Sequence, residues 1–109
     1  MPRFVVLSHD WPEPHFDLLL EAGPVLRAWR LRGEPGAAAV PAEPNADHRT
    51  LYLDYEGPVS GGRGSVTRWD AGTFDWIVEA ACAVVELRGE RLTGRFVIGD
   101  GLCRVTNDE

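Results

Sequence analysis

The sequence contains no lysine, and its 11 strongly basic residues are all arginines. Against 17 acidic residues they leave a formal net charge of -6, which argues against broad, charge-driven adhesion to nucleic acid or to an anionic membrane. A narrow phosphate site stays open, since the planar fork of arginine suits bidentate phosphate contacts better than the point charge of lysine does. A GC-rich genome would explain the arginine bias equally well.

Cysteine and long apolar runs are also scarce. The two cysteines, Cys82 and Cys103, are far apart, so no Cys-x-x-Cys metal motif exists, and we expect both thiols to be buried. No long apolar run follows Met1, which predicts neither a secretory signal nor a membrane span and makes the cytoplasm the default location. The glycine-rich segment 56–64 lacks the Gly-Lys-Ser/Thr ending of a nucleotide-binding phosphate loop. We expect a single domain over residues 1–109 and, by default, a monomer.

Short apolar segments separated by glycine and proline turns make up most of the chain. They predict strands over residues 3–7, 15–21, 25–31, 51–55, 65–69, 83–87, 91–98 and 102–105. Three prolines and two glycines predict a long surface loop over 33–46, and one or two helical turns are expected within 73–81. So many short strands predict an all-β fold, a small closed or partly closed antiparallel β-barrel with at most one short helix.

The stretch from residue 8 to residue 21 holds two of the three histidines and a nearby carboxylate. On a strand, His15, Asp17 and Leu19 would share a polar face, while residues 16, 18 and 20 would face the core. His9 precedes a loop whose two prolines bar a helix, and such a loop could fold His9 back beside the other two. Two imidazoles and one carboxylate with open positions suit Mn, Fe or Zn in a working site. Short His/Asp spacings also recur by chance, so ordinary surface residues without a shared role are the alternative.

Further motifs extend this pattern along most of the chain. In order they are Phe4-Val5-Val6, His9-Asp10, His15-Phe16-Asp17, Leu20-Glu21, Leu26-x-x-Trp29, Asp47-His48 with Tyr52, Glu56-Gly57, Trp69-Asp70-x-Gly72-Thr73 and Gly89-x-x-Leu92-x-Gly94-x-Phe96. Together they resemble the 3′-phosphoesterase domain at the N-terminus of bacterial DNA ligase D, which also occurs as free-standing proteins. No single piece is decisive, but their order and spacing are fairly specific.

This resemblance implies a metal-dependent phosphoesterase that removes a 3′-phosphate or a 3′-ribonucleotide from nucleic-acid 3′ ends in DNA repair. The implied cofactor is a divalent metal, usually manganese, with zinc or another transition metal as the alternative. Carried over by position, His9, His15 and Asp17 bind the ion, while His48 and Tyr52 contact the phosphate as catalytic residues. For Tyr52, an ordinary strand tyrosine is an equal alternative. The implied partners are the nucleic-acid 3′ end and DNA ligase or other repair proteins, with no membrane involved.

The chain departs from the family pattern near the expected site. The family has an arginine two residues after the aspartate, where this chain has Leu19, so a phosphate-binding fork is missing. Arg30 or Arg32 could replace a basic residue that the family contributes after the third strand, and Arg49 or Arg63 could supply further positive charge. Two hypotheses follow: a minimal metal-dependent phosphoesterase, or a catalytically weak or inactive member that serves as a binding or scaffolding module in DNA repair. The acidic balance and Leu19 favour the second.

Overall fold

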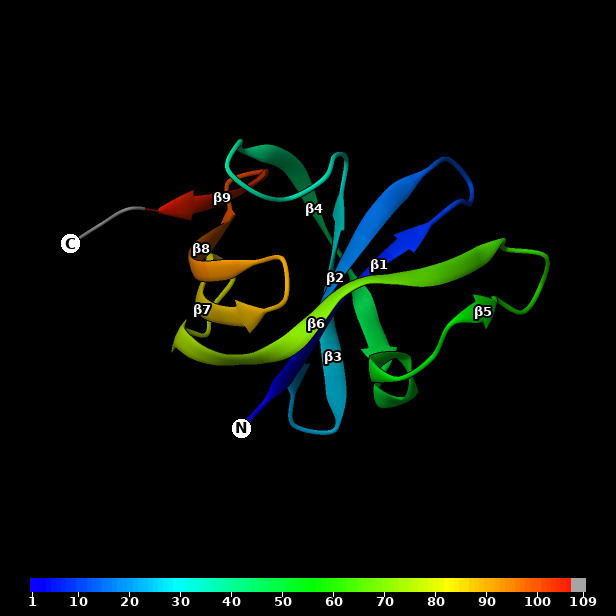
Figure 1. The fold of residues 1–109 in the computed structure, drawn as a ribbon, viewed down its shortest axis with the longest axis horizontal. Helices are drawn as coiled ribbons and strands as arrows, with labels where there is room; N and C mark the ends of the chain where they lie inside the picture. Colours follow the sequence, from blue (N-terminus) through cyan, green and yellow to red (C-terminus); the bar gives the residue numbers. More distant parts are fainter. Residues whose placement is uncertain (107–109) are drawn as a thin grey trace.

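The computed structural model describes residues 1–106, which form a β-barrel (Figure 1). Its elements are β1 (Arg3–His9), β2 (His15–Ala22), β3 (Val25–Leu31), β4 (Val40–Arg49), the 3-10 helix η1 (Thr50–Leu53), β5 (Gly57–Pro58), β6 (Ser65–Val78), β7 (Ala83–Gly89), β8 (Thr93–Gly99) and β9 (Leu102–Thr106). The strands pair in the order β1-β2-β3-β4-β9-β8-β7-β6, and β6 pairs back with β1. All pairings are antiparallel, so eight strands close into a barrel, and the predicted all-β class with at most one short helix is confirmed.

The barrel interior is filled by apolar side chains from all eight of these strands. Because successive residues of a strand face opposite sides, every second residue of each strand points inward. This interior cluster includes Phe4, Val6, Leu18, Leu20, Trp29, Leu31, Val40, Ala42, Phe74, Ala83, Val85, Leu87, Leu92, Phe96, Ile98 and Cys103. The interior is therefore a packed apolar core.

A second apolar cluster lies on the outer face of β1, β2 and β3. It contains the alternate residues of these strands together with residues from η1 and β6, namely Val5, Leu7, Leu19, Leu26, Ala28, Leu53 and Val66. The sequence predicted a polar outer face for β2, but this face is covered by the segment that includes η1, and Leu19 is fully buried. As a result His15 and Asp17, which share this face with Leu19, are each only 4% exposed.

Three local predictions were wrong. Residues 40–49 form β4 instead of the end of a loop, so only residues 33–39 of the predicted loop lie outside a strand. Prolines are tolerated in β4 because it pairs with β9 only at Val40 and Pro41, which leaves most of that edge without a ladder. The predicted strand at 51–55 is largely η1, and residues 73–78 continue β6 instead of turning into a helix.

The cysteines differ from each other in environment. Cys103 faces the barrel interior, and burial raises the pKa of its thiol to about 12. Cys82 is exposed in the turn between β6 and β7, contrary to the expectation that both thiols are buried.

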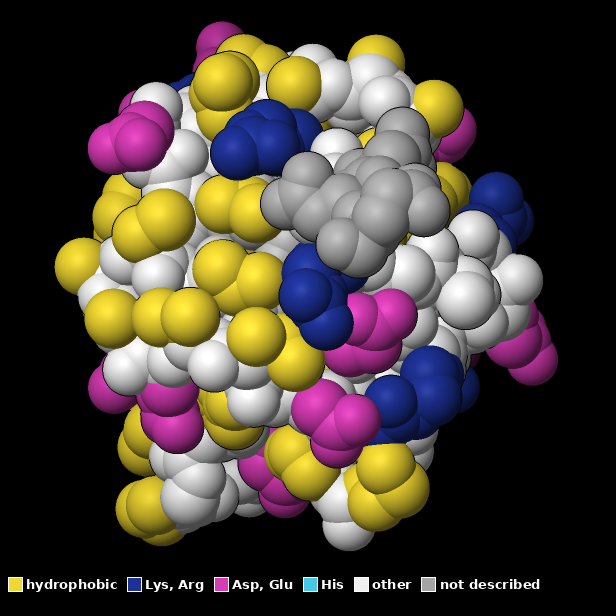
Figure 2. All heavy atoms as spheres, turned by 90° about the vertical axis from the view of Figure 1, so that its left-hand side faces the viewer, with side chains coloured by type: hydrophobic (Ala, Val, Ile, Leu, Met, Phe, Trp, Pro, Cys, Tyr) yellow, Lys and Arg dark blue, Asp and Glu magenta, His cyan; other side chains and the backbone are white. Residues whose placement is uncertain are grey.

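Figure 2 shows the face of the molecule that lies on the left in Figure 1, and apolar side chains gather on it. The large apolar residues that are exposed in β6 and β9 include Ile77, Val78 and Leu102. No histidine is visible on this face, so the candidate site lies elsewhere.

Asp70 of β6 fastens the turn that joins β7 and β8. Its buried carboxylate accepts hydrogen bonds from the backbone N–H groups of Ala71, Glu90, Arg91 and Leu92 at 2.9, 2.9, 3.1 and 2.8 Å. Gly72 and Gly89 allow this close approach, since a Cβ on Gly72 would lie 2.0 Å from the carbonyl oxygen of Arg88 and one on Gly89 would lie 2.4 Å from Asp70 Oδ2. The motifs around Asp70, Gly72 and Gly89 in the sequence pattern therefore have a structural role.

Within residues 1–106 no helix is long and apolar enough to cross a membrane.

Candidate metal centre

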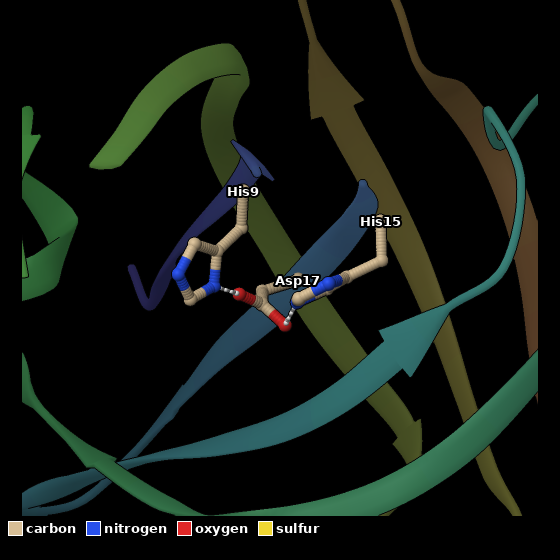
Figure 3. Close-up of side chains that lie close together, drawn as sticks. All are labelled: His9, His15 and Asp17. Carbon is tan, nitrogen blue, oxygen red and sulfur yellow. Dashed lines mark hydrogen bonds and ion pairs between the residues drawn. The ribbon is translucent and has the colours of Figure 1, made fainter. Parts of the chain in front are cut away.

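His9, His15 and Asp17 lie together at one end of the β1–β2 hairpin (Figure 3). His9 ends β1 and pairs directly with His15, which begins β2, while Asp17 pairs with Leu7. Strand alternation places all three side chains on the outer face of the barrel. One ligand atom from each lies within 4.8 Å of the other two, and the imidazole centroids are 4.8 Å apart. The proline-containing loop between β1 and β2 therefore places His9 beside His15 and Asp17, as the sequence suggested.

Backbone carbonyls set the tautomer of both imidazoles. His9 Nε2 lies 2.9 Å from the carbonyl oxygen of Arg63, and His15 Nδ1 lies 2.8 Å from that of Glu13. A carbonyl oxygen only accepts hydrogen bonds, so each of these ring nitrogens carries the proton. In the neutral rings, His9 Nδ1 and His15 Nε2 are then left with lone pairs. Metal-binding histidines are commonly held in this way, with the second ring nitrogen donating to a carbonyl group.

Both of these ring nitrogens lie close to the carboxylate of Asp17. His9 Nδ1 lies 3.2 Å from Asp17 Oδ2, and His15 Nε2 lies 3.1 Å from Oδ1 (Figure 3). His15 Nε2 is buried and has no hydrogen-bond partner, which leaves an unsatisfied acceptor beside a buried carboxylate. Two neighbouring ligands at about 2.0–2.2 Å from one ion are roughly 3.0–3.6 Å apart, and the separation of each imidazole nitrogen from the nearer carboxylate oxygen falls in this range. The residues present therefore suit a divalent metal that accepts nitrogen and oxygen ligands.

A pocket of about 440 Å³ extends from His9 and Asp17 toward β4 and η1. Besides these two residues, its walls include Leu7, Trp11, Arg30, Asn45, Ala46, Asp47, His48, Arg49, Tyr52, Val59, Ser60, Arg63 and Val66. Three arginines face two carboxylates here, although the whole chain has a net charge of -6. The pocket thus combines a candidate metal centre with locally concentrated positive charge, which suits an anionic ligand.

His48 and Tyr52 reach this pocket from β4 and η1. The Nδ1 atom of His48 donates to the carbonyl oxygen of Ala46 at 2.9 Å, so its Nε2 is the ring nitrogen left without this backbone partner. The rings of His48 and Tyr52 pack edge to face with centroids 5.7 Å apart. Tyr52 lies in a 3-10 helix where the sequence predicted a strand, yet it lines the same pocket as His48 and His9.

The structure separates the arginines that the sequence singled out for phosphate binding. Arg49 and Arg63 line the pocket, and Arg63 Nε donates to the carbonyl oxygen of Ser60 at 2.7 Å. Arg32 is not among the pocket residues, because its guanidinium pairs at 3.2 and 3.1 Å with two glutamates at positions 13 and 43. Arg30 lines the pocket instead. The register of the hairpin decides this, since Ala22 pairs with Val25 across a turn at residues 23–24, which brings position 30 opposite position 17.

Sequence comparisons give an independent measure of relationship. The family described as the DNA Ligase D 3′-phosphoesterase domain matches residues 7–99. The "Multifunctional non-homologous end joining DNA repair protein LigD" of Mycobacterium tuberculosis is 31% identical over 106 residues, and so is the "Multifunctional non-homologous end joining protein LigD" of Mycobacterium bovis. Each match covers 87% of this chain but 14% of the relative, so the chain spans only a small part of their length. The matched region contains the whole metal centre and its pocket, and the chain belongs to the DNA ligase D 3′-phosphoesterase domain family.

Proposed function

We propose that this protein is a metal-dependent phosphoesterase that removes a 3′-phosphate or a 3′-ribonucleotide from nucleic-acid 3′ ends in DNA repair. The observation that supports this most is the convergence of two imidazole lone pairs and the Asp17 carboxylate beside an arginine-lined pocket. Family membership supports the reaction class, and the names of the mycobacterial relatives support a place in end joining. A DNA ligase or another repair protein is the partner that such a function implies.

The proposed ligands are His9 Nδ1, His15 Nε2 and a carboxylate oxygen of Asp17. We propose manganese, with zinc or another transition metal as the alternative, because this mixed nitrogen and oxygen set suits either. When bound, such an ion polarises a phosphoryl group and lowers the pKa of a coordinated water molecule. The carbonyl groups behind both rings hold the other ring nitrogen of each histidine, so the nitrogen beside Asp17 is the one left free for an ion.

Residues on the opposite wall are proposed to handle the substrate. His48 Nε2 would exchange a proton with the ester oxygen that leaves the phosphorus, since its Nδ1 is held by a backbone carbonyl. Tyr52, packed against the His48 ring, would orient that imidazole or contact the phosphate. Arg49 and Arg63 would balance the negative charge of the phosphate.

The test is a primer that carries either a 3′-phosphate or a single 3′-terminal ribonucleotide, incubated with the purified protein and Mn²⁺. The parent protein is expected to produce a 3′-hydroxyl end, and EDTA should stop the reaction. His9→Ala and His48→Ala should each lower the rate by about 100-fold or more. Glu43→Gln is the matched control, because Glu43 lies on β4 with His48 but outside the pocket. Equal activity of the parent and both histidine variants would contradict the proposal.

One observation favours a second function, that of a binding module without catalysis. Leu19 occupies the position where the family pattern has an arginine, and its side chain is fully buried beneath the metal centre. The β2 strand therefore contributes no guanidinium to the pocket. A protein that binds Mn²⁺ and nucleic-acid 3′ ends, yet forms no product over a range of metals and substrates, would be such a module.

A further inference from the structure

We propose that Arg30 of β3 binds the substrate phosphate and supplies the guanidinium that the family pattern places on β2 at position 19. The inference rests on the proposed function only for the nature of the ligand, a phosphate at a nucleic-acid 3′ end. The binding of a phosphate group by Arg30 is a separate statement, which follows from the position and surroundings of this side chain.

The strand register brings Arg30 to the site. Arg30 pairs directly with Asp17 across the β2–β3 ladder, and Leu19 pairs with Ala28. Position 30 is therefore a diagonal neighbour of position 19 on the same outer face, about 7–8 Å away and within reach of a long side chain. Both Arg30 and Asp17 line the pocket, so β3 brings a guanidinium to the pocket beside the candidate metal ligand of β2.

Arg30 has no partner inside the described part of the chain. Its Nε is buried and lacks a hydrogen-bond acceptor, and no ion pair or ring contact engages its guanidinium. Asp17 is directly opposite in register, but its carboxylate is the partner of the two imidazoles instead. Burying an unpaired N–H of a charged group is costly, so the site is completed by a ligand that brings acceptor oxygens. A phosphate group offers the bidentate geometry that a guanidinium matches best.

A simpler reading is that Arg30 only covers the outer apolar cluster with its aliphatic stem, as long charged side chains often do. Its neighbours on this face, Leu26 and Ala28, are buried in that cluster. The two readings differ in what the charged end contributes. Arg30→Met keeps an apolar stem of similar length and removes the fork, and Arg30→Lys keeps the charge and removes the bidentate geometry.

The test measures the affinity of the full chain for inorganic phosphate by isothermal titration calorimetry, with EDTA and again with Mn²⁺. Relative to the parent, Arg30→Met should weaken binding by about tenfold to one hundredfold, and Arg30→Lys should weaken it less. Arg32→Met is the matched control just beyond the end of β3 and should bind like the parent, because Arg32 pairs with glutamates outside the pocket. In the primer assay, Arg30→Met should raise KM for the 3′-phosphate substrate more than it lowers kcat.

The outcomes separate this inference from the proposed function. If the parent cleaves the primer while Arg30→Met binds phosphate as tightly as the parent does, the role of Arg30 is wrong and the enzymatic function stands. If the parent cleaves nothing but its phosphate affinity depends on Arg30, the enzymatic function is wrong and the phosphate site stands. No phosphate binding by the parent would also overturn the inference. If circular dichroism shows that Arg30→Met does not fold, Arg30→Lys replaces it in the test. A phosphate affinity and a KM equal to those of the parent would then overturn the inference about Arg30.

Discussion

Asp17→Asn should be more stable than the parent without metal and less stable than the parent when metal is added. The Asp17 side chain is only 6% exposed, and its polar partners within residues 1–106 are His9 Nδ1 and His15 Nε2. With neutral rings, both of these nitrogens carry lone pairs, so without a cation the carboxylate has no hydrogen-bond donor. Leaving a buried charged acceptor unsatisfied costs about 1–3 kcal/mol or more. An asparagine amide can donate to one ring nitrogen, and the metal-free variant should therefore be more stable by about 1–3 kcal/mol.

Metal should have the opposite effect. An ion present at 100 times its Kd stabilises the folded parent by about 2.7 kcal/mol, and Asp17→Asn should lose most of this gain. With about 4–8 °C of melting temperature per kcal/mol for a chain of this size, both differences are measurable by thermal unfolding. The melts are recorded at pH 8 with EDTA and then with excess Mn²⁺, where protons compete least for the ring nitrogens.

Asp47→Asn provides the control, since Asp47 lines the same pocket without belonging to the metal cluster. It should respond to Mn²⁺ as the parent does. The reasoning is refuted if Asp17→Asn is destabilised by more than about 1 kcal/mol in EDTA, because the carboxylate then has a favourable partner in the metal-free state. A metal-induced shift as large in Asp17→Asn as in the parent would equally refute it.

Three further outcomes are expected. Asp70→Asn should lower the free energy of unfolding by about 3–5 kcal/mol, because a charged acceptor of four backbone N–H groups is lost; urea titrations followed by tryptophan fluorescence measure this. The control Asp75→Asn, at an exposed position, should change the free energy of unfolding by less than about 1 kcal/mol. In native protein a thiol reagent should modify Cys82 quickly and Cys103 only after unfolding, which peptide mass spectrometry can assign. The hydrogen bond from an arginine lowers the pKa of the Asp54 carboxyl below its ordinary 3.8, so Asp54→Asn should be slightly less stable than the parent at neutral pH, and this difference should disappear as the pH falls below 3.8 in acid-unfolding curves.

The barrel could be predicted because most of its strands carry their own signals. Alternating apolar residues bounded by glycine mark the hairpins of residues 15–31 and 83–98, and both hairpins are present. Their turns differ from the prediction, since the first is at residues 23–24 instead of 22–24 and the second at residues 90–92 instead of 88–90. The strand β4 could not be found in this way, since its composition of proline and alanine is typical of a loop and its strand conformation comes from pairing with β3. The apolar residues of 51–55 would also fit a strand, which the sequence predicted. In the structure Leu53 belongs to the 3-10 helix η1, and its side chain is buried in the outer apolar cluster.

The candidate site was only partly predictable for a related reason. The spacing of His9, His15 and Asp17 is local, so a hairpin with a short loop is enough to bring them together. Arg30 and Arg32 are two residues apart, so strand alternation alone would place both on the same face. They differ because β3 ends at Leu31: Arg30 pairs with Asp17 in the register with β2, whereas Arg32 lies beyond the strand and pairs with two glutamates.

The division of each strand between an inner and an outer face explains how the site can change without harming the fold. On β1, β2 and β3 one alternating set fills the barrel, and the other set carries both the candidate metal ligands and the outer apolar cluster. An exchange of arginine for Leu19 therefore adds apolar surface to the outer cluster and leaves the barrel interior untouched. In our proposal Arg30 of β3, which lines the pocket and pairs with Asp17, supplies the positive charge that β2 does not. Stability and chemistry should accordingly be separable, with Asp70→Asn weakening the barrel while metal binding persists, and Asp17→Asn doing the reverse.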